Sequence, residues 1–244
     1  MTKQVIYEIS QDIKNDSLVS EEEFSDMYQH SITNPNEFWH EQASNYLEWI
    51  SEWDQVSEHN FSKGQVSWFK GGKLNATVNC IDRHLASRAN QTAIIWEGDD
   101  PYESNHISYQ ELHESVCKFS NALKERGVNK GDRVCIYMPM IPEAAYAMLA
   151  CARIGAIHSV VFVGFSPESL KDRILDSDCQ TVITADEGLR GSKIIPLKEN
   201  VDEALITMQY EMEKKQEGKE SRLMDILIAK EWKSLFKIPD VKIY

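Results

Sequence analysis

Residues 131–166 read GDRVCIYMPMIPEAAYAMLACARIGAIHSVVFVGFS, and this stretch decides the fold. Residues 133–138 form a short apolar run, which predicts one buried strand. Two prolines then end the strand and favour the start of a helix over residues 144–154. A glycine ends that helix, and residues 158–162 are predicted as a second strand. Strand, helix and strand in this order predict a βαβ unit, whose parallel strands are covered on both faces.

The segments on either side continue the same alternation. Residues 92–97 and 181–184 are predicted as strands. Ser108 begins a predicted helix with a capping box, and Ser166 followed by a proline begins another. Because helices and strands alternate from residue 92 to residue 184, the sequence predicts one doubly wound α/β layer with a mainly parallel sheet.

The two ends of the chain are predicted to be helical. Residues 1–33 read as a polar segment with one short helix, which begins at Ser20. A second helix begins at Asn34, and large apolar side chains follow at roughly helical spacing: Phe38, Trp39, Tyr46, Trp49 and Ile50. This stripe predicts an N-terminal helical layer. Residues 206–244 read as two charged helices broken at a glycine, which predicts a helical C-terminal tail.

Composition and charge narrow the class of protein. The 244 residues are 42% hydrophobic, which is ample for a buried core, and the net charge is −13. This acidity disfavours a nucleic-acid partner or an anionic membrane surface, because both need a basic face. No window approaches the roughly 20 apolar residues needed to cross a bilayer, and the first residues lack the apolar core of a signal peptide.

The five cysteines point to buried thiols. They lie far apart without a Cys-x-x-Cys pair, and three of them fall within apolar helix or strand patterns. Such spacing is typical of core thiols in a reducing compartment rather than of a metal or redox centre. We therefore expect a cytoplasmic protein without a metal site.

One short segment has the composition of an anion-binding loop. Residues 185–193, ADEGLRGSK, follow a predicted strand end, where open α/β sheets place ligands. Arg190 offers a bidentate fork and Lys193 a point charge, while Gly191 allows close approach of the backbone and Ser192 adds a hydroxyl. These groups suit a phosphate, but a solvated basic loop on an acidic protein has the same composition.

Two other patterns carry no chemistry. Residues 72–73, Gly-Lys, match the Gly-Lys pair of the phosphate-binding P-loop motif G-x-x-x-x-G-K-[ST]. The rest of the motif does not match, because Ser67 stands where its first glycine belongs and Leu74 stands where its metal-binding hydroxyl belongs. The segment is better interpreted as a loop that caps the next helix through Asn75. Residues 82–84, Asp-Arg-His, are consecutive and therefore spread around a helix instead of converging. No catalytic residue is predicted.

Several long segments occur in the same order as in a known family. They are FWHEQASNYLEWI from residue 38, WFKGGKLNATVNCIDRHL from residue 68, ISYQELHESVCKFSNALKERGVNKGDRV from residue 107, MPMIPEAAYAMLACARIGAIHSVVFVGFSPESL from residue 138 and TADEGLRGSKIIPLKENVDEAL from residue 184. Together they resemble the N-terminal part of AMP-forming acetyl-CoA synthetases, members of the adenylate-forming superfamily. The resemblance runs from about residue 34 to residue 205 and marks these residues as an α/β region of that family.

The resemblance implies a partial CoA site. In this family the loop that matches residues 190–193 contacts the 3′-phosphate end of CoA. The turn that matches Phe162, Val163 and Gly164 lies beside the adenine. The chain departs from the family at two of these positions: Lys193 stands where a second arginine is usual, and Val163 stands where a glycine is usual.

The resemblance also implies which parts are absent. These enzymes convert acetate, Mg-ATP and CoA into acetyl-CoA, AMP and pyrophosphate through an acyl-adenylate. The sequence contains no Ser/Thr-Gly-Ser/Thr-x-Gly-x-Pro-Lys loop for the ATP phosphates, and the acyl pocket and the adenine segments lie beyond its length. We expect an N-terminal portion of an acetate–CoA ligase that is inactive alone. Two alternatives stay open: a CoA-binding or regulatory module that pairs with full-length synthetase or with itself, and a degraded gene product.

Overall fold

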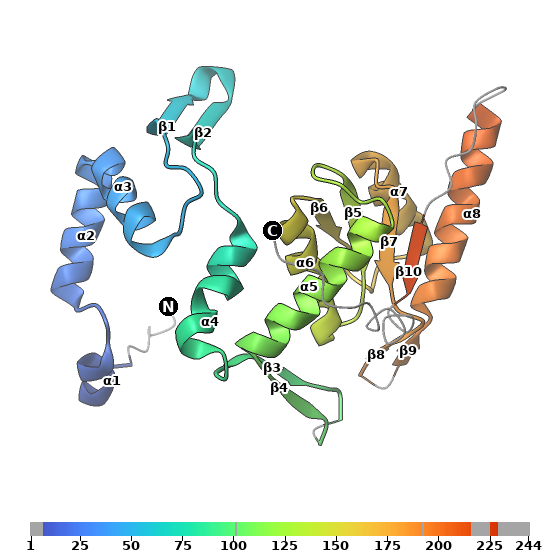
Figure 1. The fold of residues 1–244 in the computed structure, drawn as a ribbon, viewed down its shortest axis with the longest axis horizontal. Helices are drawn as coiled ribbons and strands as arrows, with labels where there is room; N and C mark the ends of the chain where they lie inside the picture. Colours follow the sequence, from blue (N-terminus) through green and yellow to red (C-terminus); the bar gives the residue numbers. More distant parts are fainter. Residues whose placement is uncertain (1–6, 101, 192, 216–224, 229–244) are drawn as a thin grey trace, which may run out of the picture. The chain divides into compact units, whose positions relative to one another are not determined.

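Figure 1 shows the computed structural model of the chain, which describes residues 7–100, 102–191, 193–215 and 225–228. The chain forms two compact units, Met1–Leu74 and Asn75–Tyr244. Among the described residues, no helix is long and apolar enough to cross a membrane.

The first unit combines helices with a β-hairpin. Its elements are α1 (Gln11–Asp16), α2 (Glu21–Thr33), α3 (Pro35–Tyr46), β1 (Gln55–Asn60), η1 (Phe61–Lys63) and β2 (Gln65–Lys70). The predicted capping box is confirmed, because the Ser20 side chain accepts a hydrogen bond from the Glu23 backbone N–H. The antiparallel pair of β1 and β2 occupies residues that the sequence assigned in part to a loop.

The predicted single aromatic stripe is wrong. Helix α3 ends at Tyr46, so Trp49 and Ile50 lie beyond it. The indole N–H of Trp49 donates to the Ala43 carbonyl at 3.0 Å, which folds the chain back after the helix. The Trp49 ring then lies 5.4 Å from the Phe69 ring at the end of β2. The aromatic residues therefore join the helix to the hairpin, a contact that helical spacing does not reveal.

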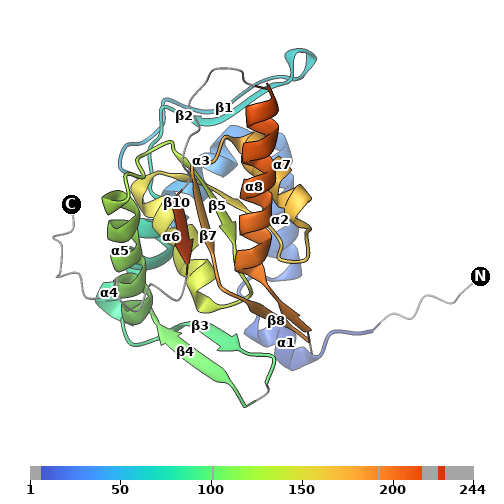
Figure 2. The same cartoon turned by 90° about the vertical axis from the view of Figure 1, so that its right-hand side faces the viewer.

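The second unit is built on a parallel sheet with strand order β10–β7–β5–β6. The strands are β5 (Arg133–Tyr137), β6 (Ile157–Val160), β7 (Thr181–Thr184) and β10 (Asp225–Ile228). The connecting helices are α5 (Tyr109–Glu125), α6 (Pro142–Ile154), α7 (Pro167–Ser177) and α8 (Leu197–Lys215). Figures 1 and 2 show α5 and α6 on one face of this sheet and α7 and α8 on the other. The predicted doubly wound α/β architecture is confirmed.

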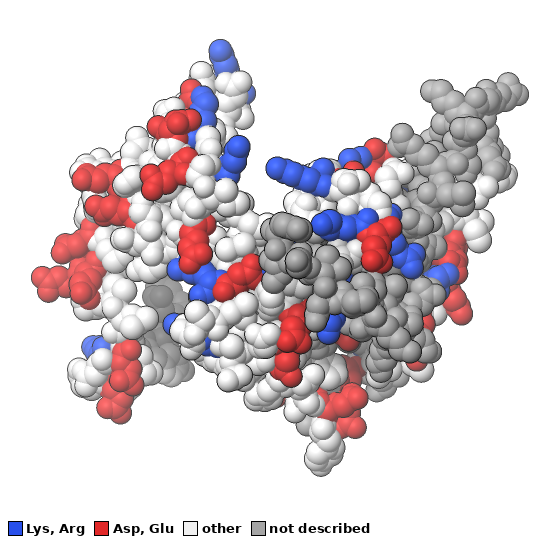
Figure 3. Space-filling model, viewed as in Figure 1, with Lys and Arg blue, Asp and Glu red and all other residues white. Residues whose placement is uncertain are grey.

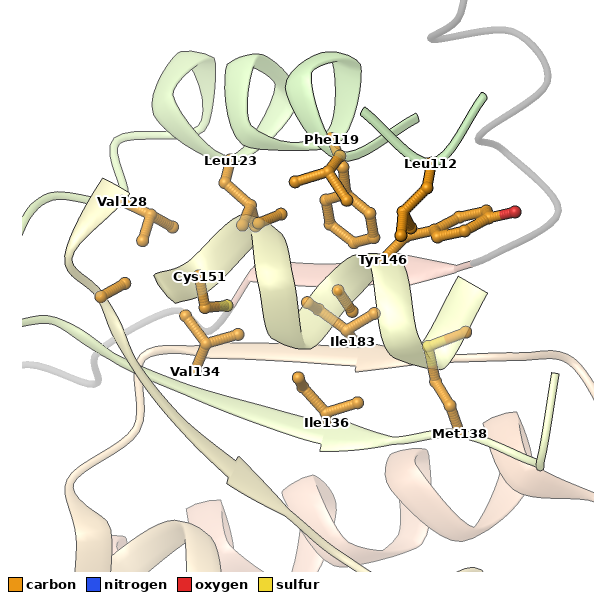
Figure 4. Packing of buried hydrophobic residues seen from close by; sticks show 14 of the residues in the cluster. Leu112, Phe119, Leu123, Val128, Val134, Ile136, Met138, Tyr146, Cys151 and Ile183 are labelled. Atoms are coloured by element: carbon orange, nitrogen blue, oxygen red, sulfur yellow. The ribbon is translucent and has the colours of Figure 1, made fainter. Parts of the chain in front are cut away.

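Strand β5 contributes to two hydrophobic cores. Val134 and Ile136 point into a core that α5 and α6 cover, as Figure 4 shows. Cys135 and Tyr137 point the opposite way, into a core that α7 and α8 cover. Successive side chains of a strand alternate between faces, so a continuous apolar run is needed when both faces are buried. This accounts for the run that the sequence shows at residues 133–138.

The ends of the helices follow their sequence signals. Ser108 caps α5 in a reciprocal capping box with Glu111. Ser166 caps α7 by accepting from the Ser169 N–H. Gly155 ends α6 with a φ of +76°, in the left-handed region that glycine adopts without strain.

A short helical segment precedes the α/β layer, and Asn75, just before this segment, caps the end of α6. The segment consists of η2 (Val78–Asp82) and α4 (Arg83–Arg88). The Asn75 amide donates to the carbonyls of Ala152 and Arg153 at the end of α6, at 3.3 and 3.0 Å. The Asn75 carboxamide oxygen accepts from the Thr77 N–H at 2.9 Å. Asn75 therefore satisfies carbonyls that a helix end leaves unpaired.

At two predicted elements the structure differs from what the sequence predicts. Strand β3 (Thr92–Glu97) pairs antiparallel with β4 (Ser104–Ser108) and does not join the parallel sheet. The short turn between them permits only antiparallel pairing, because a parallel pair needs a long crossover. In the tail, α8 continues to Lys215 as expected. The second predicted helix is contradicted only at residues 225–228, and its other residues lie outside the described part of the chain. Residues 225–228 form β10, whose backbone pairs with the edge of β7.

The double burial of β5 makes its side chains critical for stability. Changing Ile136, which is 1% exposed, to Ala should lower the free energy of unfolding by about 3 kcal/mol through lost contacts and a cavity. Urea unfolding followed by circular dichroism measures this change. Ile95→Ala on β3, where the side chain is 64% exposed, is the matched control and should change stability by less than about 0.5 kcal/mol. Equal effects of the two changes would contradict this assignment of the core.

Candidate functional site

The candidate site lies at the carboxyl edge of the parallel sheet. Tyr137 ends β5, the turn with Phe162 follows β6, and Arg190 lies on a hairpin that follows β7. Because these three strands are parallel, the segments that follow them emerge at one edge, where open α/β sheets bind ligands. The hairpin consists of β8 (Gly188–Arg190) and β9 (Lys193–Ile195), which Figure 1 labels.

The structure brings the two predicted segments into contact. The guanidinium carbon of Arg190 lies 4.9 Å from the centre of the Phe162 ring. This is a cation–π arrangement, which attracts the charge to the face of the ring. The Phe162 side chain is 50% exposed, so the ring keeps accessible surface beside the arginine. Sequence spacing alone could not place these residues together.

Gly164 provides the space for this contact. A Cβ atom at Gly164 would lie 2.5 Å from Cε1 of Phe162 and 2.8 Å from Nη1 of Arg190. Real side chains do not approach so closely, so any larger residue must displace one of the two groups. Glycine at this position therefore permits the stacking of Arg190 on Phe162.

The β8–β9 hairpin presents the two cations at its tip. Arg190 and Lys193 are partners in the strand register and both are exposed. Gly191 has a φ of +58°, which favours glycine in the tight turn. Ser192, the predicted hydroxyl of the loop, lies outside the described residues. At the base, a Cβ at Gly188 would lie 2.9 Å from Cβ of Pro139, so the hairpin packs closely against the loop after β5.

A second pair of cation and aromatic ring extends the surface. The Phe165 ring stands edge-on to Phe162 with 5.9 Å between their centres. The guanidinium carbon of Arg173, on α7, lies 4.3 Å from the centre of the Phe165 ring. Sequence reasoning missed Phe165 and Arg173. The only available signal was the position of Phe165 within the turn after β6, at the ligand-binding edge of the sheet.

The buried side chain of Tyr137 contacts the backbone of the turn after β6. Sequence reasoning did not identify Tyr137 as part of the site. The Tyr137 hydroxyl oxygen lies 3.2 Å from the carbonyl oxygens of both Val163 and Phe165, which share its single proton, and accepts from Nδ2 of Asn200 at 3.2 Å. Burial raises the pKa of Tyr137, while the hydrogen bond from Asn200 opposes this shift. The hydroxyl therefore stays protonated and remains a donor at neutral pH.

The residues at positions 82–84 diverge, as predicted. Asp82 accepts two hydrogen bonds from the Arg153 guanidinium, at 2.9 and 2.5 Å, and so ties η2 to the end of α6. The His84 ring lies 5.2 Å from the ring of Tyr109. Within the described part of the chain, no group of three His, Cys, Asp or Glu residues has the geometry of a metal site.

Lys and Arg side chains do not gather into one large area on the face drawn in Figure 3, as far as it is described. They are interspersed there with Asp and Glu, in keeping with the net charge of −13. An extended basic surface of the kind that binds polyanions is therefore not seen on this face.

Comparison with protein families identifies the fold. The family model of the AMP-binding enzymes matches residues 81–235, which include the sheet, both cores and the candidate site. The chain belongs to the AMP-binding enzyme family. A second model, the acetyl-coenzyme A synthetase N-terminus, matches residues 24–80. The match of the AMP-binding model continues past residue 205, where the sequence resemblance was expected to end, and includes β10.

Curated relatives within this family are acetyl-coenzyme A synthetases. Acetyl-coenzyme A synthetase 2 of Pseudomonas aeruginosa is 60% identical over 200 residues, which cover 82% of this chain and 31% of the relative. The acetyl-coenzyme A synthetase of Alcanivorax borkumensis is 61% identical over 205 residues, which cover 84% of this chain and 32% of the relative. The chain thus spans about a third of the length of these relatives, and the family resemblance is confirmed.

The close approach at Gly164 can be tested directly. Gly164→Ala should displace Arg190 from the Phe162 ring but change the free energy of unfolding by less than about 1 kcal/mol, because the neighbouring atoms are ends of side chains. Nuclear magnetic resonance detects the displacement, because the Arg190 side-chain protons lose the shift caused by the aromatic ring. Val163→Ala, one position earlier, is the control and should leave the Arg190 signals in place. Unchanged Arg190 signals in Gly164→Ala would contradict the contact.

Proposed function

We propose that this chain carries the CoA-contacting N-terminal portion of an AMP-forming acetate–CoA ligase. In this proposal Arg190, Ser192 and Lys193 bind the 3′-phosphate of CoA, and Gly191 lets the loop backbone approach it. The turn of Phe162, Val163 and Gly164 lies beside the adenine. The observation that carries the proposal is the stacking of Arg190 on Phe162, which joins the loop and the turn into one exposed surface.

The chemistry of this surface suits an adenine nucleotide with a phosphate. Arg190 presents planar donors for phosphate oxygens, and Lys193 adds a second positive charge at the same hairpin tip. The exposed part of the Phe162 ring offers an apolar face for a base. A protein with a net charge of −13 needs such local cations to hold an anionic ligand.

The adenylate-forming step is not expected of this chain. Its sequence lacks the Ser/Thr-rich loop that would hold the phosphates of Mg-ATP. The relatives, whose matched parts cover 31% and 32% of their own lengths, are named acetyl-coenzyme A synthetases. For this chain we propose CoA binding without ligase activity of its own.

We also propose a cytoplasmic location. All five cysteines are free thiols, and Cys135, Cys151 and Cys179 are buried. Burial raises the pKa of Cys135 and of Cys151 to about 12, so these thiols stay protonated and inert. Inert core thiols fit a reducing compartment.

Calorimetry with two ligands tests the CoA proposal. If Arg190 and Lys193 bind the 3′-phosphate, CoA should bind at least about tenfold more tightly than 3′-dephospho-CoA, since charge-assisted hydrogen bonds contribute about 1.5–3 kcal/mol. Arg190→Ala should remove most of this preference. Arg88→Ala, at the exposed end of α4, is the matched control and should preserve it. Equal affinities of the unchanged protein for the two ligands would refute the assignment.

An exchange assay tests the absence of ligase activity. The purified chain should show no acetate-dependent exchange of pyrophosphate into ATP, because the groups that bind the ATP phosphates are missing from its sequence. A full-length acetyl-coenzyme A synthetase serves as the positive control. Robust exchange by the purified chain would show that it makes acetyl-adenylate unaided.

A further inference from the structure

The turn after β6 is stabilised by one buried hydroxyl. Tyr137 is completely buried at the carboxyl end of β5, and its hydroxyl lies 3.2 Å from each of the Val163 and Phe165 carbonyl oxygens. Those two carbonyls flank Gly164, the position that gives Arg190 access to Phe162. A single side chain therefore holds the backbone on both sides of the glycine.

The direction of these hydrogen bonds is fixed by Asn200 in the first turn of α8. The Asn200 amide donates to the Tyr137 oxygen at 3.2 Å, so the hydroxyl proton remains available for the carbonyls. The Phe165 N–H also donates to the Phe162 carbonyl at 3.1 Å, which closes the turn. Side chains from β5 and α8 thus converge on a turn that follows β6.

We infer that Tyr137 is a positioning residue for the candidate CoA site: its hydroxyl, oriented by Asn200, holds the turn that places Phe162 against Arg190. Tyr137 does not touch a ligand in this arrangement, because its side chain is buried beneath the turn. Its role in ligand binding rests on the proposed function, but its role in fixing the turn does not.

Amide hydrogen exchange tests the positioning without any ligand. In Tyr137→Phe, which keeps the ring and removes only the hydroxyl, the Phe165 amide should exchange about tenfold faster, because the turn loses its hydrogen bonds. The Val161 amide, which donates to the Ile136 carbonyl in the sheet, should keep its rate. Tyr146→Phe is the matched control, because Tyr146 is a buried tyrosine in the core on the other face of the sheet. An unchanged Phe165 rate in Tyr137→Phe would overturn the inference.

A pair of changes at Asn200 repeats the test if Tyr137→Phe fails to fold. An aspartate at this position can only accept, so Asn200→Asp should draw the hydroxyl proton away from the carbonyls and speed Phe165 exchange. Asn200→Ala leaves the proton free for the turn and should have a smaller effect. Equal exchange rates in the two Asn200 variants would overturn the inference.

Calorimetry then connects the turn to the proposed function. Tyr137→Phe should weaken the binding of both CoA and 3′-dephospho-CoA about three- to tenfold, because the turn lies beside the adenine that the two ligands share. CoA should lose at least as much affinity as 3′-dephospho-CoA, because the same turn places Phe162 against Arg190. Unchanged affinity for both ligands, together with faster Phe165 exchange, would overturn the role in ligand binding. Failure of the unchanged protein to bind CoA would refute the proposed function, and the exchange rates would still decide the role of Tyr137 in fixing the turn.

Discussion

The burial of strand β5 on both faces is the constraint on which the second unit depends. Ile136 and Val134 require the cover of α5 and α6, while Cys135 and Tyr137 require that of α7 and α8. A strand with two buried faces needs helices on both sides, and crossover helices of this kind connect parallel strands. The order β10–β7–β5–β6 follows, with β5 in the interior of the sheet. Everything at the carboxyl edge takes its position from this arrangement.

The candidate site is a consequence of the same arrangement. Parallel strands deliver the segments that follow them to one edge, so the turn after β6 and the hairpin after β7 meet there. Gly164 lets Arg190 reach the Phe162 ring, and the buried Tyr137 hydroxyl holds the backbone on both sides of that glycine. Tyr137, which ends β5, thereby fixes the turn that carries Phe162. The packing of the sheet thus sets the geometry of the candidate site.

Local signals were reliable where a single element determines the outcome. The caps at Ser108 and Ser166 and the helix end at Gly155 follow from backbone hydrogen bonding within a few residues, and all are confirmed. Local signals did not predict the outcome where a segment has to choose among several possible pairing partners in the fold. The strand at residues 92–97 reads like any sheet strand, but it pairs with its neighbour across a short turn and not with the parallel sheet. Residues 225–228 read as helix and instead pair with the open edge of β7.

The sequence by itself determined the doubly wound α/β class, through its apolar periodicity, and the membership of a family, through long matching segments. The two segments proposed to contact CoA come from that resemblance and stay a prediction. Only the tertiary structure decided that Arg190 stacks on Phe162, that Phe165 and Arg173 extend the surface, and that Tyr137 lies beneath it. Those contacts join residues on different strands and helices, and their distances are set by the packing of the sheet rather than by spacing along the chain.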